Sequence, residues 1–114
     1  MKILGIGVDI TKNSRIKELI KNKSFINRTF GKKEIDFSKK KINKINFFAK
    51  RFAAKESFAK SLGTGFRNNL NLKDIEILNN KMGKPYFIKS KKINDIKKKR
   101  FKIQKYDLFL SISD

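Results

Sequence analysis

Glu56 and Lys60 stand one helical turn apart within RFAAKESFAKSLGTG, the stretch that covers residues 51–65. Helical spacing predicts that the helix containing this segment buries one stripe of side chains. The stripe is formed by Ile45, Phe48, Ala49, Phe52, Ala53 and Ala59. Glu56 falls near the middle of the stripe and Lys60 toward its edge. On an exposed face the pair would be an ordinary contact worth about 0.2–0.5 kcal/mol. In a buried stripe a carboxylate is costly unless a charge or a metal compensates it, which favours a functional role.

A second acid, Asp9, follows the apolar segment Ile6, Gly7 and Val8. A single aspartate at the end of a strand is commonly only a cap for the next helix. The chain has no cysteine and no histidine, which excludes disulfides, thiolate metal sites and the usual general base. Two acids in apolar segments then favour an oxygen-only site for a hard cation such as Mg²⁺.

The paired glycines are weak signals for nucleotide binding when taken alone. GIGVDI lacks the third glycine of a dinucleotide fingerprint, since Ile10 occupies its place, and GTGFRNN lacks the Walker lysine. The segment Gly63, Thr64 and Gly65 nevertheless belongs to a chain with several candidate phosphate-binding cations, namely Arg51, Lys55, Lys60 and Lys84. Glycines let backbone approach a ligand closely, so this combination suits a phosphorylated ligand.

The composition is strongly basic, with 30 Lys and Arg against 10 Asp and Glu and a net charge of +20. Such charge suggests nucleic-acid binding. Abundant Lys, Asn, Ile and Phe are instead typical of an AT-rich coding sequence, which we take as the main source. The surface would still attract an anionic partner such as an acidic protein. MKILGIGVDI lacks the unbroken apolar region of a signal peptide, so we expect a cytoplasmic protein.

The first half of the chain is predicted to form one strand and several helices. A buried strand covers 3–10, and a short helix with a basic outer face begins after Asn13 or Ser14. One or two short helices follow, interrupted at Gly31, and residues 39–41 form a solvated connection. The long helix then runs from about Asn43 or Asn46 to Leu62, and Gly63 is its expected left-handed cap.

The second half is predicted to add a hairpin, a helix and a strand. Ile75 and Ile77 alternate, residues 79–83 turn, and the second strand resumes at 86–88 with Pro85 at its start. A weak basic helix buries Ile93 and Ile96, and YDLFLSISD (106–114) forms a closing strand. This order predicts a single α+β domain over residues 1–114.

Four segments together form a distinctive pattern. They are GIGVDI with Arg15 and Ile16 downstream, FINRTFGKKE (25–34), FFAKRFAAKESFAKSLGTGFRNNL (47–70) and DIEILNNKMGKPYF (74–87). The most specific part is an aromatic-x-x-K-E-x-x-x-K motif after a distant G-x-D. In this pattern the chain resembles the bacterial holo-[acyl-carrier-protein] synthases of the 4'-phosphopantetheinyl transferase superfamily. The fold that this resemblance implies is a small mixed sheet packed against a long central helix.

The resemblance also implies a reaction. The 4'-phosphopantetheine arm of coenzyme A is transferred to a serine of apo acyl carrier protein, and adenosine 3',5'-bisphosphate is released. This step supports fatty acid biosynthesis. Neither a nucleic acid nor a membrane is an expected partner.

By the same resemblance, Asp9 and Glu56 bind Mg²⁺, and Lys60 approaches the phosphates. Both the GTG segment (63–65) and the GKP turn, formed by Gly83, Lys84 and Pro85, line the coenzyme A cleft. Arg51 and Lys84 are the candidates for phosphate contacts. Without histidine, a carboxylate or a metal-bound water must take the serine proton, and we favour Glu56 through a water, with Glu34 as the weaker candidate.

Acyl carrier proteins are acidic, so the expected docking surface is the basic face of the first helix, especially Arg15, Lys17 and Lys21. Short members of the family are homotrimers with the cleft between subunits, which we expect here as well. Family members usually continue through a further strand after SISD, so we expect the chain ending at Asp114 to lack that strand. Two alternatives stay open, a small basic RNA-binding protein and a truncated, inactive transferase.

Overall fold

The computed structural model describes residues 11–62, 71–101, 108, 110 and 112. The strand predicted over 3–10 and the cap predicted at Gly63 lie outside these residues. The predicted closing strand, 106–114, lies mostly outside them too. Leu108, Leu110 and Ile112 are half-buried and belong to no described strand, so the closing strand stays a prediction.

Three short helices open the described part of the chain, α1 (Asn13–Leu19), α2 (Lys23–Thr29) and α3 (Lys32–Ser38). The prediction that Asn13 or Ser14 caps α1 is wrong, because Lys12 occupies the cap position without a side-chain bond. The helix begins early enough to bring Ile16 fully into the core. Asn22 caps α2, since its Oδ1 accepts hydrogen bonds from the backbone N–H groups of Ser24 and Phe25.

Gly31 separates α2 from α3 as predicted and is the N-cap residue of α3. Its N–H donates to Oε1 of Glu34 at 2.9 Å, so the third residue of the helix satisfies the cap backbone. A side chain at Gly31 would overlap the carboxyl group of Glu76. Gly31 therefore has two roles, because it starts α3 and leaves space for the carboxyl group of Glu76.

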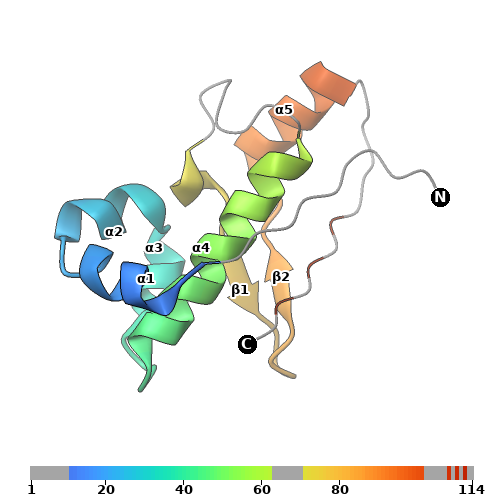
Figure 1. Ribbon diagram of the computed structural model, residues 1–114. Helices are drawn as coiled ribbons and strands as arrows, with labels where there is room; N and C mark the ends of the chain where they lie inside the picture. Colours follow the sequence, from blue (N-terminus) through green and yellow to red (C-terminus); the bar gives the residue numbers. More distant parts are fainter. Residues whose placement is uncertain (1–10, 63–70, 102–107, 109, 111, 113–114) are drawn as a thin grey trace.

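The long helix α4 (Lys44–Ser61) matches the prediction closely. Asn43 caps it by accepting a hydrogen bond from the N–H of Asn46 at 3.0 Å, and Leu62 follows its last residue. Figure 1 shows α4 running between α1–α3 on one side and β2 (Pro85–Phe87) and α5 (Lys91–Phe101) on the other. It is the only described helix of this length, and both hydrophobic clusters of the described residues pack against it.

The chain after the GTG segment forms the short 3₁₀ helix η1 (Leu72–Asp74) and the antiparallel strands β1 (Ile77–Asn79) and β2 (Pro85–Phe87). Ile77 pairs with Phe87 and Asn79 with Pro85, which confirms the predicted hairpin. Gly83 has φ of +84°, a left-handed conformation that glycine adopts without strain. Helix α5 (Lys91–Phe101) then buries Ile93 and Ile96, also as predicted.

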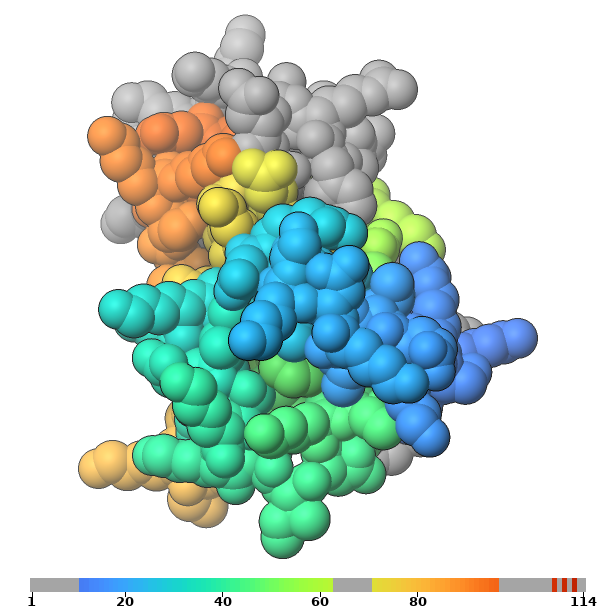
Figure 2. Space-filling view, turned by 90° about the vertical axis from the view of Figure 1, so that its left-hand side faces the viewer, coloured from blue at the N-terminus to red at the C-terminus, as the bar shows by residue number. Residues whose placement is uncertain are grey.

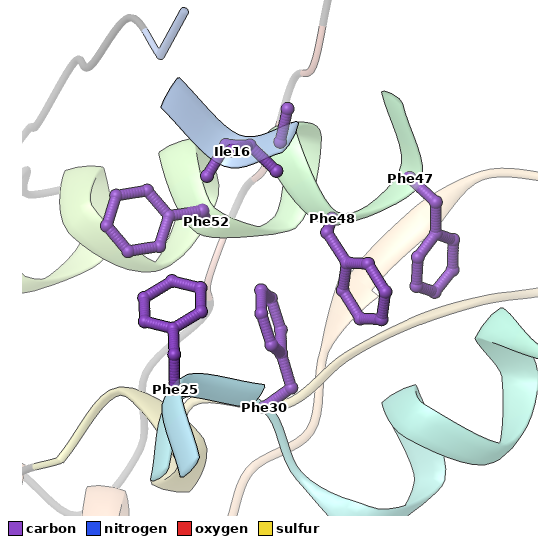
Figure 3. Packing of buried hydrophobic residues seen from close by; sticks show 7 residues of the cluster. Ile16, Phe25, Phe30, Phe47, Phe48 and Phe52 are labelled. Atoms are coloured by element: carbon purple, nitrogen blue, oxygen red, sulfur yellow. The ribbon is translucent and has the colours of Figure 1, made fainter. Parts of the chain in front are cut away.

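Two hydrophobic clusters form the core. The first joins α1, α2 and α4 and is mostly aromatic, with the buried residues Ile16, Phe25, Phe30, Phe47, Phe48, Ala49 and Phe52. Figure 3 shows the ring of Phe30 between those of Phe25 and Phe48, with centroid separations of 6.2 and 4.6 Å. The second is mostly aliphatic, and its buried residues are Phe58, Leu62, Ile75, Ile93 and Ile96. The aromatic cluster thus lies toward the start of α4 and the aliphatic cluster toward its end.

Candidate active site

The buried face of α4 overlaps the predicted stripe but is rotated from it around the helix axis. Phe48, Phe52 and Ala59 are buried as expected, but Lys55 is fully buried and Glu56 is only half-buried. At 100° per residue, Glu56 lies about one residue's rotation away from Lys55 around the helix. The prediction that Glu56 lies near the middle of the buried stripe is therefore wrong, and Lys55 takes that place.

Lys55 and Glu34 form an ion pair in the core. Both side chains have 0% exposure, and Nζ of Lys55 lies 2.6 Å from Oε1 of Glu34. Lys55 also donates to the backbone carbonyl oxygens of Leu72, at 3.0 Å, and Ile75. Its ammonium group lies 5.5 Å from the centroid of the Phe30 ring. Three oxygen acceptors thus surround the three N–H donors of this lysine.

Glu34 is equally well bonded. Its Oε1 accepts from the N–H of Gly31 as well as from Lys55, and its Oε2 accepts from the N–H of Ile77 at 3.1 Å. Burial raises the pKa of Glu34, and the nearby charge of Lys55 opposes that rise. Burial lowers the pKa of Lys55, and Glu34 opposes that fall. Each ion therefore keeps its charge in the core chiefly because the other is present.

This geometry corrects two predictions. Lys55 was expected among the cations that approach a phosphorylated ligand, but its ammonium group is enclosed and fully engaged with Glu34, Leu72 and Ile75. Glu34 was the weaker candidate for the general base. Its carboxylate has no exposure and already accepts bonds from Gly31, Lys55 and Ile77, so it cannot reach a substrate hydroxyl. Both residues instead connect α4 to α3, η1 and β1 at this point.

Arg51 lies one turn before Lys55 and is also buried, with 5% exposure. Its guanidinium group stacks over the ring of Phe47 at 3.8 Å and donates to Oδ1 of Asn79 in β1. Burial lowers the pKa of Arg51, and the charge of Glu34 opposes this. Arg51, which the sequence predicted to contact phosphate, thus points at the hairpin in the described structure. Its contact with phosphate stays a prediction.

Asn79 connects this arginine to the GKP turn. Its Nδ2 donates to the carbonyl oxygen of Gly83 at 2.9 Å, while its Oδ1 accepts from Arg51. A continuous polar chain therefore runs from α4 through β1 to the residue before Lys84, whose side chain is exposed. Sequence reasoning missed Asn79 because the contact with Arg51 spans 28 positions and has no periodic signal.

Glu56 and Lys60 lie on the flank of α4. Lys60 is exposed in the last turn, and the side chains are four residues apart, so they share one side of the helix. Asp9 and the segment 63–65 lie outside the described residues. Within the described residues, no three acidic side chains gather into a metal-binding cluster. Glu56 contributes the hard carboxylate oxygen that a Mg²⁺ site needs, so its chemistry fits the predicted metal.

Of the predicted docking residues, Arg15 and Lys17 lie on α1 and Lys21 lies just after it. Arg15, Lys17 and Lys21 are all exposed, and the guanidinium group of Arg15 lies over the ring of Phe52 at 5.6 Å. Lys21 is 3.3 Å from Glu18 in a solvent-exposed pair. Figure 2 shows the face that α1, α2 and α3 form together. In the described part of the chain, no helix is long and apolar enough to cross a membrane.

The fold and the order of motifs along the chain define a class of protein. Residues 5–110 match the family described as the 4'-phosphopantetheinyl transferase superfamily, and this chain belongs to that family. The holo-[acyl-carrier-protein] synthase of Pelagibacter ubique is 59% identical over 114 residues, which are 100% of this chain and 89% of that protein.

Solved structures agree. The holo-[acyl-carrier-protein] synthase of Neisseria meningitidis is similar with a TM-score of 0.80 and 34% identity, over 88% of this chain and 82% of that one. The enzyme of the same name from Bacillus anthracis, solved with CoA (3',5'-ADP), is similar with a TM-score of 0.69 and 38% identity. That match covers 77% of this chain and 76% of the other. The α+β phosphopantetheinyl transferase fold expected from the sequence is thus confirmed.

Proposed function

We propose that this chain transfers the 4'-phosphopantetheine group of coenzyme A to a serine of apo acyl carrier protein. The observation that carries the proposal is the superfamily match over residues 5–110, nearly the whole chain. The products are holo acyl carrier protein and adenosine 3',5'-bisphosphate. This activity supports fatty acid biosynthesis, and its setting is the cytoplasm.

In the proposed reaction, the serine oxygen forms a bond to the phosphorus that carries the pantetheine arm. The bond from that phosphorus to the bridging oxygen of the pyrophosphate breaks, and adenosine 3',5'-bisphosphate leaves. Glu56 takes the serine proton through a water, and exposed Lys60 stabilises negative charge on the leaving phosphate. A Mg²⁺ ion held by Asp9 and Glu56 would neutralise further charge on the pyrophosphate.

The GKP turn supplies the second part of the proposed coenzyme A site. Asn79 holds the carbonyl of Gly83 and is itself held by Arg51, so the turn is fixed relative to α4. Lys84 directs an exposed ammonium group from this turn toward solvent. The positions of α4 and the turn are thereby coupled, which suits a ligand that contacts both. Gly63, Thr64, Gly65 and Pro85 complete the proposed lining.

The acidic acyl carrier protein docks, in this proposal, on the basic outer face of α1. Arg15 and Lys17 are exposed there, Lys21 is exposed just after the helix, and opposite charges speed association. The proposed assembly is a homotrimer with the cleft between subunits. Light scattering should then give three times the mass of one chain.

The decisive experiment incubates the protein with Mg²⁺, coenzyme A and apo acyl carrier protein, and measures the mass of the carrier protein. We expect a phosphopantetheine adduct on a serine. A carrier protein that stays apo, under conditions where a known synthase modifies it, would contradict the transferase function. That result would favour an inactive transferase. If the protein also bound RNA with sequence selectivity, the result would favour the RNA-binding protein.

Glu56→Gln tests the assignment within the site. The variant keeps the volume of the side chain and removes its charge, so we expect turnover to fall by about 100-fold or more while the fold stays intact. Omitting Mg²⁺ should also abolish turnover by the parent protein. Normal transfer by Glu56→Gln would show that the base and the metal ligand lie elsewhere.

A further inference from the structure

We propose that the buried pair of Lys55 and Glu34 positions the side chains of Glu56 and Lys60 for catalysis. This inference rests on the proposed transferase function. Lys55 immediately precedes Glu56 in α4, and neither Lys55 nor Glu34 is accessible to a substrate. The pair is therefore a set of positioning residues that act through the orientation of the helix.

The ammonium group of Lys55 connects α4 to two other segments, α3 and η1 with its C-cap residue. It donates to Glu34 in α3 at 2.6 Å, to the carbonyl of Leu72 in η1 at 3.0 Å, and to the carbonyl of Ile75 beyond η1. Glu34 extends the connection to β1 through the N–H of Ile77 at 3.1 Å. Lys55 thus connects α4 directly to α3 and η1, and through Glu34 to β1.

These bonds restrict α4 in a way that apolar packing does not. Hydrogen bonds weaken steeply when distance or angle changes, and charged ones are shorter and stronger than neutral ones. A rotation or a slide of α4 would take the buried ammonium group of Lys55 away from its three acceptors and the carbonyl oxygen of Ile75 away from this donor. The helix therefore has one preferred rotation about its own axis, and this rotation sets the direction of Glu56.

The pair of Lys55 and Glu34 contributes little net stability compared with apolar side chains of the same volume. Buried ion pairs lose hydration on folding, and well-packed apolar residues of similar volume often give equal or higher stability. The structure nevertheless retains a lysine and a glutamate at the centre of the face between α3, α4 and β1. A role in orientation accounts for that choice, because small displacements of reacting groups reduce rates strongly.

The test compares Lys55→Met with Lys33→Met, a matched change at an exposed position on α3. Turnover and KM for coenzyme A are measured well below the unfolding temperature, and activity is expressed per folded molecule. For Lys55→Met we expect kcat to fall by about 100-fold, with a much smaller change in KM. Lys33→Met should match the parent protein. A pair that served stability alone would reduce the folded fraction and leave kcat per folded molecule unchanged.

Glu34→Gln provides a second route if Lys55→Met does not fold, because it keeps side-chain volume and one oxygen acceptor. We expect its kcat to fall by about tenfold. The inference is overturned if the folded variant keeps the kcat of an active parent protein within about threefold. An inactive parent protein is a different result, because it contradicts the transferase function itself and the positioning role along with it.

Discussion

The two ends of α4 are held by different kinds of contact. Toward its start, rings from α2 and α4 pack together with Ile16 of α1, and the contacts among them are apolar. Toward its end, an aliphatic cluster lies beside the charged bonds of Lys55 to Glu34, Leu72 and Ile75. Apolar burial is nearly independent of direction, whereas hydrogen bonds require one geometry. The aromatic end therefore supplies stability, and the charged end specifies orientation next to the proposed catalytic residues.

Phe48→Ala is the strongest test of the aromatic end. Phe48 is buried, and its ring lies 4.6 Å from that of Phe30 and 5.3 Å from that of Phe47. Because the substitution leaves a cavity, we expect the free energy of unfolding to fall by about 3–5 kcal/mol. Urea unfolding at several pH values would measure this, and the loss should not depend on pH. A strong pH dependence would mean that the aromatic cluster is coupled to the ion pair.

Lys55→Met should instead destabilise the charged end in a pH-dependent way, by about 3 kcal/mol at neutral pH. Without Lys55, the pKa of Glu34 rises further above its ordinary value of 4.5. A carboxyl whose pKa is raised in the folded state supports folding below its unfolded pKa and loses this effect as pH rises. The deficit of the variant should therefore shrink as pH falls from 7 toward 4.5.

The control for this pH effect is the double variant Glu34→Gln with Lys55→Met. It has no ionisable group at either position, so its deficit relative to the parent protein should vary much less between the two pH values. The measurement is again the urea midpoint. Equal pH profiles for the single and double variants would mean that Glu34 does not carry a buried charge.

Gly83→Ala tests the hairpin turn, which the polar chain through Asn79 holds against α4. Space is available for the added methyl group, but φ of +84° strains any side chain. We expect a loss of about 1–2 kcal/mol in the free energy of unfolding. Thermal unfolding would measure it. If the carbonyl of Gly83 also moves, KM for coenzyme A should rise; an unchanged KM would separate the turn from the proposed cleft.

Lys21→Met gives the smallest expected effect and shows what an exposed ion pair contributes. Lys21 and Glu18 are 3.3 Å apart with side-chain exposures of 66% and 71%. Removing the lysine should change the free energy of unfolding by less than about 1 kcal/mol. The variant should, however, weaken association with apo acyl carrier protein at low salt. Surface plasmon resonance would measure this, and unchanged association would place the docking surface elsewhere.

Local signals predicted most of the described fold. Asn43 and Gly31 marked helix boundaries, and Pro85 with Gly83 marked the hairpin. The rotation of α4 was predicted wrongly because Lys55 was left out of the buried stripe. The spacing of four and three residues through Phe48, Phe52, Lys55, Ala59 and Leu62 was the available signal, since it places position 55 on the apolar face.

The contacts behind that error could not be read from local patterns. Glu34 and Lys55 are 21 positions apart, and Arg51 and Asn79 are 28 apart. Helical and strand periodicity report which face is apolar but not which distant polar group completes a buried charge. The family resemblance, by contrast, depended on the order of motifs along the whole chain, and the superfamily match over residues 5–110 confirms it.

Asn79 illustrates how few substitutions such a contact allows. Its side-chain oxygen accepts from Arg51 while its nitrogen donates to Gly83. Aspartate would keep the acceptor and lose the donor, and leucine would lose both. A side chain of the same shape as asparagine is therefore not enough, because it must also accept one hydrogen bond and donate another. A half-buried polar position in a strand of only three residues is thus expected to tolerate almost no change in a mutational scan.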